Sequence, residues 1–183
     1  MSERYTLRRA CPAEAPAVLS LLGEVAAWLH ERGSDQWSTW RTWPQKMAPS
    51  FEEGNVWLLQ RAGELSGTIT MEERADPDFW TLDDMADSAA YLSKMAVRRD
   101  AAGAGLGDLL VWWARDRAHR SGIGRLRLDA WRSNQALHAY YRERGWRYIR
   151  TVDAPGRRSG VLFEIDAAPM PAAVRTLLLE VED

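Results

Sequence analysis

Residues 95–110 read M-A-V-R-R-D-A-A-G-A-G-L-G-D-L-L and contain the strongest structural signal of the chain. An apolar, strand-like segment ends at Val97, and glycines alternate at positions 103, 105 and 107 before apolar residues recur at helical spacing. Because glycine has no Cβ atom, successive backbone N–H groups can close on an anion. The helix behind them adds unpaired N–H groups and about half a positive charge. The stretch therefore predicts a strand, a pyrophosphate-binding turn and a helix.

The glycines are also compatible with two alternative structures. The first is a flexible connection, although that would not require a helix to begin inside it. The second is a dinucleotide-binding oxidoreductase, with Asp129 at a strand end about 20 residues further on. Against it, the third glycine of that fingerprint would fall at Asp108. Only about 50 residues follow Asp129, too few for a second nucleotide-binding half.

The hydrophobic periodicity of the chain predicts one domain of the α/β (α+β) class, with helices on the faces of a mixed sheet. Strands are expected at 6–8, 56–61, 64–72, 90–97, 125–130, 146–152 and 161–165, and helices at 12–33, 106–122 and 135–144. Residues 34–53 are expected to be irregular or weakly helical, and 73–89 to form a loop. The domain is expected to span 1–168. The extension 169–183 is expected to form a helix over 172–181, packed on the body or on a partner subunit in a homodimer.

Composition limits the functions that the chain can serve. Its 183 residues are 46 % apolar, which is enough for one core, and the net charge of −2 argues against a nucleic-acid-binding face. A single cysteine, Cys11, allows no intrachain disulfide and no thiolate zinc site, and the scattered histidines predict no metal site. No apolar run approaches the roughly 20 residues that span a bilayer. Met1–Arg9 lacks the apolar segment of a signal peptide, so a cytoplasmic location without membrane partners is expected.

A second motif follows the glycine turn after about 30 residues, with a strand between. It has the pattern N-x-A-x(4)-Y-x(3)-G-W, formed by Asn134, Ala136, Tyr141, Gly145 and Trp146. The two motifs, in this order, resemble motifs A and B of the GNAT acetyltransferases. The resemblance covers residues 92–165, and more loosely 7–10 and 56–72. It implies a mostly antiparallel sheet, acetyl-CoA as co-substrate, and direct attack by the amine of a small-molecule acceptor on the thioester.

The resemblance also implies which residues hold acetyl-CoA. They are Met95, Ala96, Val97, Ala102, Gly103, Ala104, Gly105, Leu106, Gly107 and Asn134. The N–H group of Ala96 or Val97 would polarise the thioester carbonyl, which requires no particular side chain. Asn134 is also a good N-cap residue, and capping alone would explain it. Ala102 departs from the family pattern, which has Arg or Gln there, so Arg98 or Arg99 would have to supply the missing charge.

Acyl transfer to an amine requires two proton movements. A free alkylamine has a pKa of about 10.4 and must lose a proton, whereas the leaving thiolate, with a parent pKa of about 8.5, gains one. By the resemblance, Tyr141 is the general acid, with packing in the core as the alternative. Glu72 or Glu73, at the end of a strand expected to border the acceptor site, is the candidate base. A solvated strand end is the alternative explanation for both.

The acceptor is less strongly indicated. Trp28, Trp37, Trp40 and Trp43 lie near Glu24, Glu31, Asp35, Glu72 and Glu73 in the segments expected around the acceptor site. Aromatic faces and carboxylates suit a small cationic amine, although tryptophans that fill the core would look the same. A CoA-binding or regulatory module without turnover is the remaining alternative to an enzyme.

Overall fold

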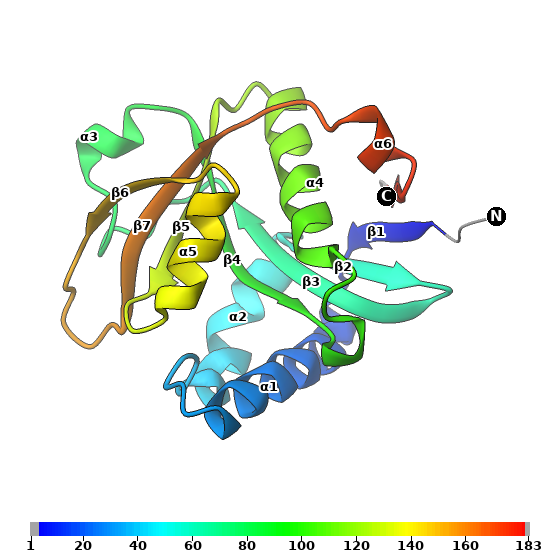
Figure 1. Ribbon diagram of the computed structural model, residues 1–183, viewed down its shortest axis with the longest axis horizontal. Helices are drawn as coiled ribbons and strands as arrows, with labels where there is room; N and C mark the ends of the chain where they lie inside the picture. The colour runs from blue at the N-terminus through cyan, green and yellow to red at the C-terminus, as the bar shows by residue number, and fades with distance from the viewer. Residues whose placement is uncertain (1–3, 182–183) are drawn as a thin grey trace.

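A computed structural model describes residues 4–181, which form one eight-stranded sheet flanked by helices (Figure 1). The strands are β1 (Tyr5–Arg9), β2 (Val56–Arg61), β3 (Glu64–Glu72), β4 (Ala89–Val97), β5 (Arg125–Trp131), β6 (Arg147–Thr151), β7 (Ser159–Asp166) and β8 (Leu178–Val181). Their order is β6-β7-β5-β4-β3-β2-β1-β8. The pairs β4–β5 and β1–β8 are parallel and the others are antiparallel, which confirms the predicted mixed, mostly antiparallel sheet.

Helices cover both faces of this sheet. They are α1 (Ala15–Glu31), α2 (Trp43–Glu52), α3 (Leu82–Met85), α4 (Leu106–Arg120), α5 (Gln135–Glu143) and α6 (Ala172–Arg175). Side chains alternate along β2, so Trp57 and Leu59 join the core under α4 and α5, whereas Val56 and Leu58 join the core under α1 and α2. Figure 1 shows α5 in front of the strands and α2 behind them. The sheet therefore separates an α4/α5 side from an α1/α2 side.

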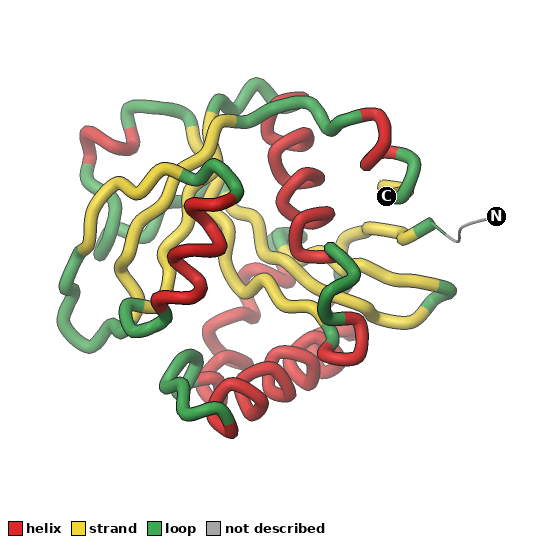
Figure 2. The backbone as a smooth tube through the Cα atoms, viewed as in Figure 1, coloured by secondary structure: helices red, strands yellow, loops and turns green. Residues whose placement is uncertain are grey.

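The two central parallel strands part in the middle of the sheet. β4 and β5 pair from Ala89 with Arg125 to Leu92 with Leu128, and then diverge (Figure 2). Just beyond this point β4 bulges, because Lys94 and Met95 together oppose a single residue of β3. Lys94 has a φ of +50°, a left-handed conformation that is unusual for a residue with a side chain. The edge of β4 that faces β5 therefore has backbone groups without strand partners after Leu92.

The C-terminal extension differs from its predicted form. Only Ala172–Arg175 is helical, and the expected helix over 172–181 is wrong in its second half, where β8 pairs with β1 from Tyr5 opposite Leu178. The reason is that β1 would otherwise leave a row of unpaired N–H and C=O groups at the sheet edge. The extension thus packs on its own chain. A homodimer remains a prediction.

Two segments are more regular than the sequence indicates. Trp43–Glu52 forms the full helix α2, with Pro44 in its first turn, where no N–H partner is lost. Within the predicted loop 73–89, α3 is capped by Thr81, whose side chain accepts a hydrogen bond from the Asp84 N–H. Among residues 4–181, no helix has the length and apolar character needed to cross a membrane.

Candidate active site

The glycine turn before α4 presents backbone N–H groups to open space. Gly103 and Gly105 have φ angles of +86° and +74°, a conformation that residues with a side chain adopt only at a cost. A Cβ atom on either glycine would meet nothing within 4 Å, so the space in front of the turn is free. Within residues 4–181, the N–H groups of Gly103, Gly105 and the first three residues of α4 donate to no backbone acceptor. This turn therefore fits a pyrophosphate group, as the sequence predicts.

Two arginines lie beside the turn, but each already has a partner. Arg98 donates to both carboxylate oxygens of Asp100, at 3.1 and 2.6 Å. The guanidinium of Arg99 lies 3.6 Å from the ring centre of Trp28. Both arginines are exposed, and an exposed ion pair contributes only about 0–1 kcal/mol, so either can turn toward a phosphate at little cost. Ala102 contributes only its backbone.

Two adjacent tyrosines on α5 differ in what their hydroxyl groups do. Tyr141 is buried, with its ring 5.5 Å from those of Trp146 and Phe163, and its hydroxyl bonds to no group within residues 4–181. Tyr140 donates to Asp108 Oδ1 on α4, at 2.8 Å. Burial raises the pKa of Tyr141, and burial together with the bond to Asp108 raises the pKa of Tyr140 to about 12. Tyr141 thus packs in the core, which the sequence also allowed, yet its proton is uncommitted.

Asn134 uses its whole side chain in contacts with the protein. Its Oδ1 atom caps α5 by accepting from the Leu137 N–H at 2.9 Å, and its Nδ2 atom donates to Gln36 Oε1 at 2.6 Å. Capping therefore accounts for this residue, as the sequence allowed. A contact between Asn134 and the cofactor arm remains a prediction.

Asp129 lies on β5, one residue past the last pair with β4. It faces away from the α4/α5 side, since its neighbours Leu128 and Ala130 belong to the core under those helices. Its carboxylate has no hydrogen bond or ion pair within residues 4–181. It nevertheless raises the pKa of Tyr141, which lies on the other side of the sheet. Asp129 thus acts electrostatically on Tyr141 across the sheet, next to the point where β4 and β5 stop pairing.

Lys94 brings a positive charge to the same opening from β4. Its Nζ atom lies 4.9 Å from the ring centre of Trp43, on the α1/α2 side of the sheet. Burial lowers the pKa of its ammonium group, an effect that Asp129 and Glu72 oppose and that Arg157 reinforces. Side-chain alternation along the predicted strand allows either Lys94 or Met95 to face the acceptor, and no sequence signal assigns Asp129 a role in this chemistry.

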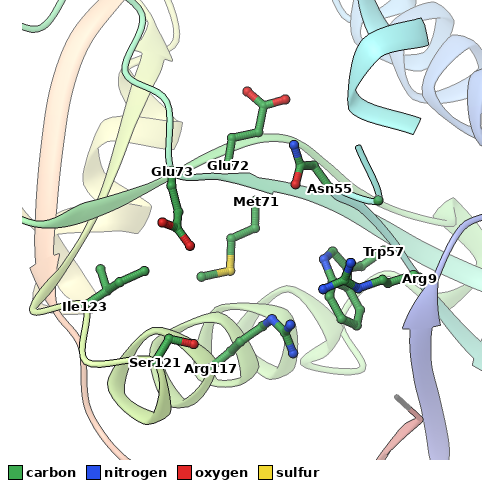
Figure 3. Close-up of a pocket in the computed structure, with 10 residues that line it drawn as sticks. Arg9, Asn55, Trp57, Met71, Glu72, Glu73, Arg117, Ser121 and Ile123 are labelled. Atoms are coloured by element: carbon green, nitrogen blue, oxygen red, sulfur yellow. The ribbon is translucent and has the colours of Figure 1, made fainter. Parts of the chain in front are cut away.

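The two glutamates proposed as the base point to different sides of the sheet. Glu72 accepts a hydrogen bond from Ser50 Oγ on α2, at 2.5 Å. A pocket of about 100 Å³ lies on the α4 side, beside the C-terminal end of that helix. Figure 3 shows Glu73 and Met71 pointing into it and Glu72 pointing away. Glu72 is therefore the glutamate that shares a side with Lys94 and Asp129.

The tryptophans proposed for the acceptor mostly contact one another or arginines. Trp37 and Trp43 pack edge to face at 5.1 Å, and both belong to the core under α1 and α2. Trp40 lies against Gly23, where an added Cβ atom would come within 2.9 Å of its ring. Trp28 is flanked by Arg99 and by a second arginine, Arg32, at 4.1 Å. Filling of the core therefore accounts for Trp43. Trp37 and Trp40 pack against that core while half-buried, and Trp28 lies between two arginines.

Comparison with known proteins agrees with this geometry. The model of the Acetyltransferase (GNAT) family matches residues 22–146. The chain is 34 % identical over 155 residues to the uncharacterized N-acetyltransferase YesJ of Bacillus subtilis, covering 80 % of this chain and 85 % of YesJ. A crystal structure of a GNAT-family acetyltransferase from Listeria monocytogenes is 25 % identical, with a TM-score of 0.75 over 88 % of this chain and 94 % of its own.

A more distant structure shares the fold. PaiA N-acetyltransferase from Thermoplasma acidophilum, crystallised with coenzyme A, is 15 % identical, with a TM-score of 0.65 over 91 % of this chain and 99 % of its own. The fold and the glycine turn define an acyltransferase rather than a dinucleotide-binding oxidoreductase. The chain belongs to the GNAT acetyltransferase family, is an acetyltransferase, and uses acetyl-CoA as its co-substrate.

Proposed function

We propose that this acetyltransferase moves the acetyl group directly from acetyl-CoA to the amine of a small acceptor, at the opening between β4 and β5. The observation that carries the proposal is that Tyr141 and Asp129, each without a protein partner for its polar group within residues 4–181, lie on elements on either side of this opening and interact electrostatically. The donor would enter from the α4/α5 side, where the glycine turn lies. The acceptor would enter from the other side, which Asp129 faces.

The backbone would hold the donor. In this proposal the N–H groups of Gly103, Gly105 and the first turn of α4 bind the pyrophosphate, and Met95, Ala96 and Val97 bind the arm along the free edge of β4. An N–H group on that edge polarises the thioester carbonyl and stabilises the charge that develops on its oxygen. Support comes from the end of pairing at Leu92, since these backbone groups have no strand partner on that edge among the described residues.

The protons would move through the two uncommitted side chains. An acceptor amine with a pKa of about 10.4 arrives charged, and the carboxylate of Asp129 takes its proton. The neutral nitrogen then bonds to the thioester carbon, the carbon–sulfur bond breaks, and Tyr141 donates its proton to the departing thiolate. The nitrogen loses its remaining extra proton to water as the amide forms, and a proton from water restores Tyr141. Glu72 is the second candidate base, although its carboxylate already accepts a bond from Ser50.

Ties between loops on the acceptor side favour a compact acceptor. Arg157, between β6 and β7, donates to Asp76 at 2.7 Å and to Asp78 at 2.6 Å in the loop after β3. Arg158 donates to Asp35, in the loop after α1, at 2.9 Å. A protein segment would have to displace these loops to enter the opening. A small cationic amine can reach the carboxylates of Asp129 and Glu72 without displacing the loops.

Direct transfer is tested with intact-protein mass spectrometry and product analysis. The protein is incubated with acetyl-CoA, first alone and then with an amine that it acetylates. Direct attack predicts no acetyl adduct on the protein in the first sample and an N-acetylated amine in the second. An adduct that forms without acceptor and is discharged by the amine would overturn direct transfer.

A further inference from the structure

Lys94 and Asp129 carry opposite charges on the two strands that part, yet they do not pair. No nitrogen–oxygen contact within 4.0 Å joins them, and neither side chain has a hydrogen bond or ion pair elsewhere in residues 4–181. They nevertheless interact electrostatically, since the carboxylate of Asp129 favours the charged form of Lys94. One charge thus lies on each of the two strands that border the opening.

Lys94 is half-buried, and its ammonium group has no hydrogen-bond partner within residues 4–181. Removing a charged group from water without giving it a hydrogen-bond partner is unfavourable, and more so than for a neutral polar group. The attraction to the Trp43 ring face, 4.9 Å from the Lys94 Nζ atom, compensates for only part of this unfavourable free energy. The nearby acid Glu72 accepts from Ser50, and no hydrogen bond or ion pair joins it to the ammonium group within residues 4–181. The missing partner of Lys94 is therefore expected to come from outside the chain.

We propose that the acceptor is a compact amino acid whose carboxylate binds Lys94 while its amine binds Asp129. The inference rests on the proposed function and specifies its substrate class. The two charges are arranged as a zwitterion requires, with the amine beside Asp129 and hence closest to Tyr141. This refines the expectation of a cationic acceptor, because the amine stays cationic while its own carboxylate neutralises Lys94.

The main competing role for Lys94 is that of a base. A buried lysine with a lowered pKa can accept a proton, and it would then assist any amine equally. The carboxylate-binding role instead predicts a difference between acceptors that differ only in that group. Several groups surround the ammonium: Asp129 on β5, Glu72 on β3, Arg157 after β6 and Lys46 on α2. Because the pKa of Lys94 is lowered, the preference should fade with rising pH below the usual range of a lysine.

The experiment compares matched acceptors. Rates of CoA thiol release are measured with several L-amino acids and with the amines that decarboxylation of each would give. The parent protein is expected to favour amino acids by at least about tenfold in kcat/KM, mostly through KM. Lys94→Met should shrink that preference by about 10–100-fold, the range for one hydrogen bond to a charged group, and Lys94→Arg should keep part of it.

The possible results separate the two claims. If the parent acetylates both classes equally, or prefers the decarboxylated amines, the amino-acid inference fails while small-amine acetylation stands. If Lys94→Met lowers kcat/KM for amino acids and for decarboxylated amines by the same factor, Lys94 does not bind the carboxylate of the acceptor. If the parent acetylates neither class although calorimetry shows that it binds acetyl-CoA, the proposed function fails as well. Should Lys94→Met not fold, the preference of the parent and its retention in Lys94→Arg decide the question.

Discussion

The carboxylate of Asp35, in the loop after α1, accepts a hydrogen bond from the indole Nε1 of Trp131, 96 residues further along at the end of β5 (2.9 Å). The same oxygen accepts from Ser133 Oγ at 2.6 Å, and its partner oxygen accepts from Arg158 at 2.9 Å. These bonds, that of Ser133 foremost, lower the pKa of Asp35 to about 2. One carboxylate thus ties the loop after α1 to the end of β5 and the β6–β7 loop, beside a pocket of about 300 Å³.

Replacing Asp35 should therefore weaken the connection between the loop after α1, the end of β5 and the β6–β7 loop, on the side proposed to bind the acceptor. Asp35→Ala leaves three donors without their acceptor, but because water reaches this site the expected loss of unfolding free energy is only about 1 kcal/mol. The acceptor KM should rise while acetyl-CoA affinity holds. Since the folded-state pKa is below the ordinary value, the stabilisation is present above about pH 4 and fades toward pH 2. Thermal unfolding against pH tests this, with the exposed Asp83→Ala as the control. A loss that persists unchanged to pH 2 would contradict it.

Gly105→Asp should abolish acetyl-CoA binding. The aspartate places a negative charge at the N-terminus of α4, where the phosphates are expected, and strains a φ of +74°. Gly63→Asp is a matched control, because Gly63 has a φ of +83°, open space around its Cβ position and a place in the β2–β3 hairpin. Isothermal titration should show binding in the parent and in Gly63→Asp but not in folded Gly105→Asp. Equal binding by both variants would place the phosphate site elsewhere.

Tyr141→Phe should slow turnover without weakening donor binding. Removing the hydroxyl deletes the proposed general acid, which typically contributes about 10²–10⁴-fold, although a thiolate can also leave unassisted. A fall in kcat of about ten- to a thousandfold is expected, with little change in stability, because the hydroxyl has no protein partner within residues 4–181. Tyr140→Phe is the comparison, since it loses only the bond to Asp108. Equally small effects in the two variants would leave Tyr141 as a core residue.

Asp129→Asn should reduce turnover more than Glu72→Gln does. The amide keeps the shape of the side chain but cannot accept the amine proton, so a fall of about 10²–10⁴-fold in kcat is expected. Glu72→Gln keeps an oxygen for Ser50 and should cost much less. Steady-state rates with saturating acetyl-CoA compare the two. The opposite order of effects would identify Glu72 as the base.

Lys94→Met should stabilise the protein while it damages the site. Methionine fills a similar volume without a buried charge, so a gain in unfolding free energy of about 1–3 kcal/mol is expected. Burial lowers the pKa of Lys94 below its value in the unfolded chain. The free energy of unfolding of the parent is therefore reduced while the lysine is protonated, and this loss disappears as rising pH removes the proton. The gain should thus be full at low pH and shrink at high pH in denaturant titrations. A destabilised variant would show that the ammonium has a compensating partner.

The sequence predicts the elements expected to bind acetyl-CoA better than those expected to bind the acceptor amine. The glycine turn and the starts of α4 and α5 follow from local signals, since backbone conformation and capping depend on neighbouring residues. The positions of Lys94 and Asp129 depend instead on where β4 and β5 stop pairing and on a bulge opposite β3, which only the assembled sheet determines. Strand β8 was missed for a similar reason. The run from Leu178 to Val181 is compatible with a helix as well as with a strand. It forms a strand because it can pair with the free edge of β1, about 170 residues earlier in the chain.

The central claim is that an acceptor amine attacks acetyl-CoA between β4 and β5, with Asp129 and Tyr141 moving the protons. The most direct test measures CoA thiol release from acetyl-CoA, with and without a panel of amines and amino acids, in the parent and in Asp129→Asn combined with Tyr141→Phe. We expect release that requires an acceptor, matches the N-acetylated product mole for mole, and nearly disappears in the double variant while acetyl-CoA still binds. Release without an acceptor, or full activity in a double variant that folds normally, would contradict the claim.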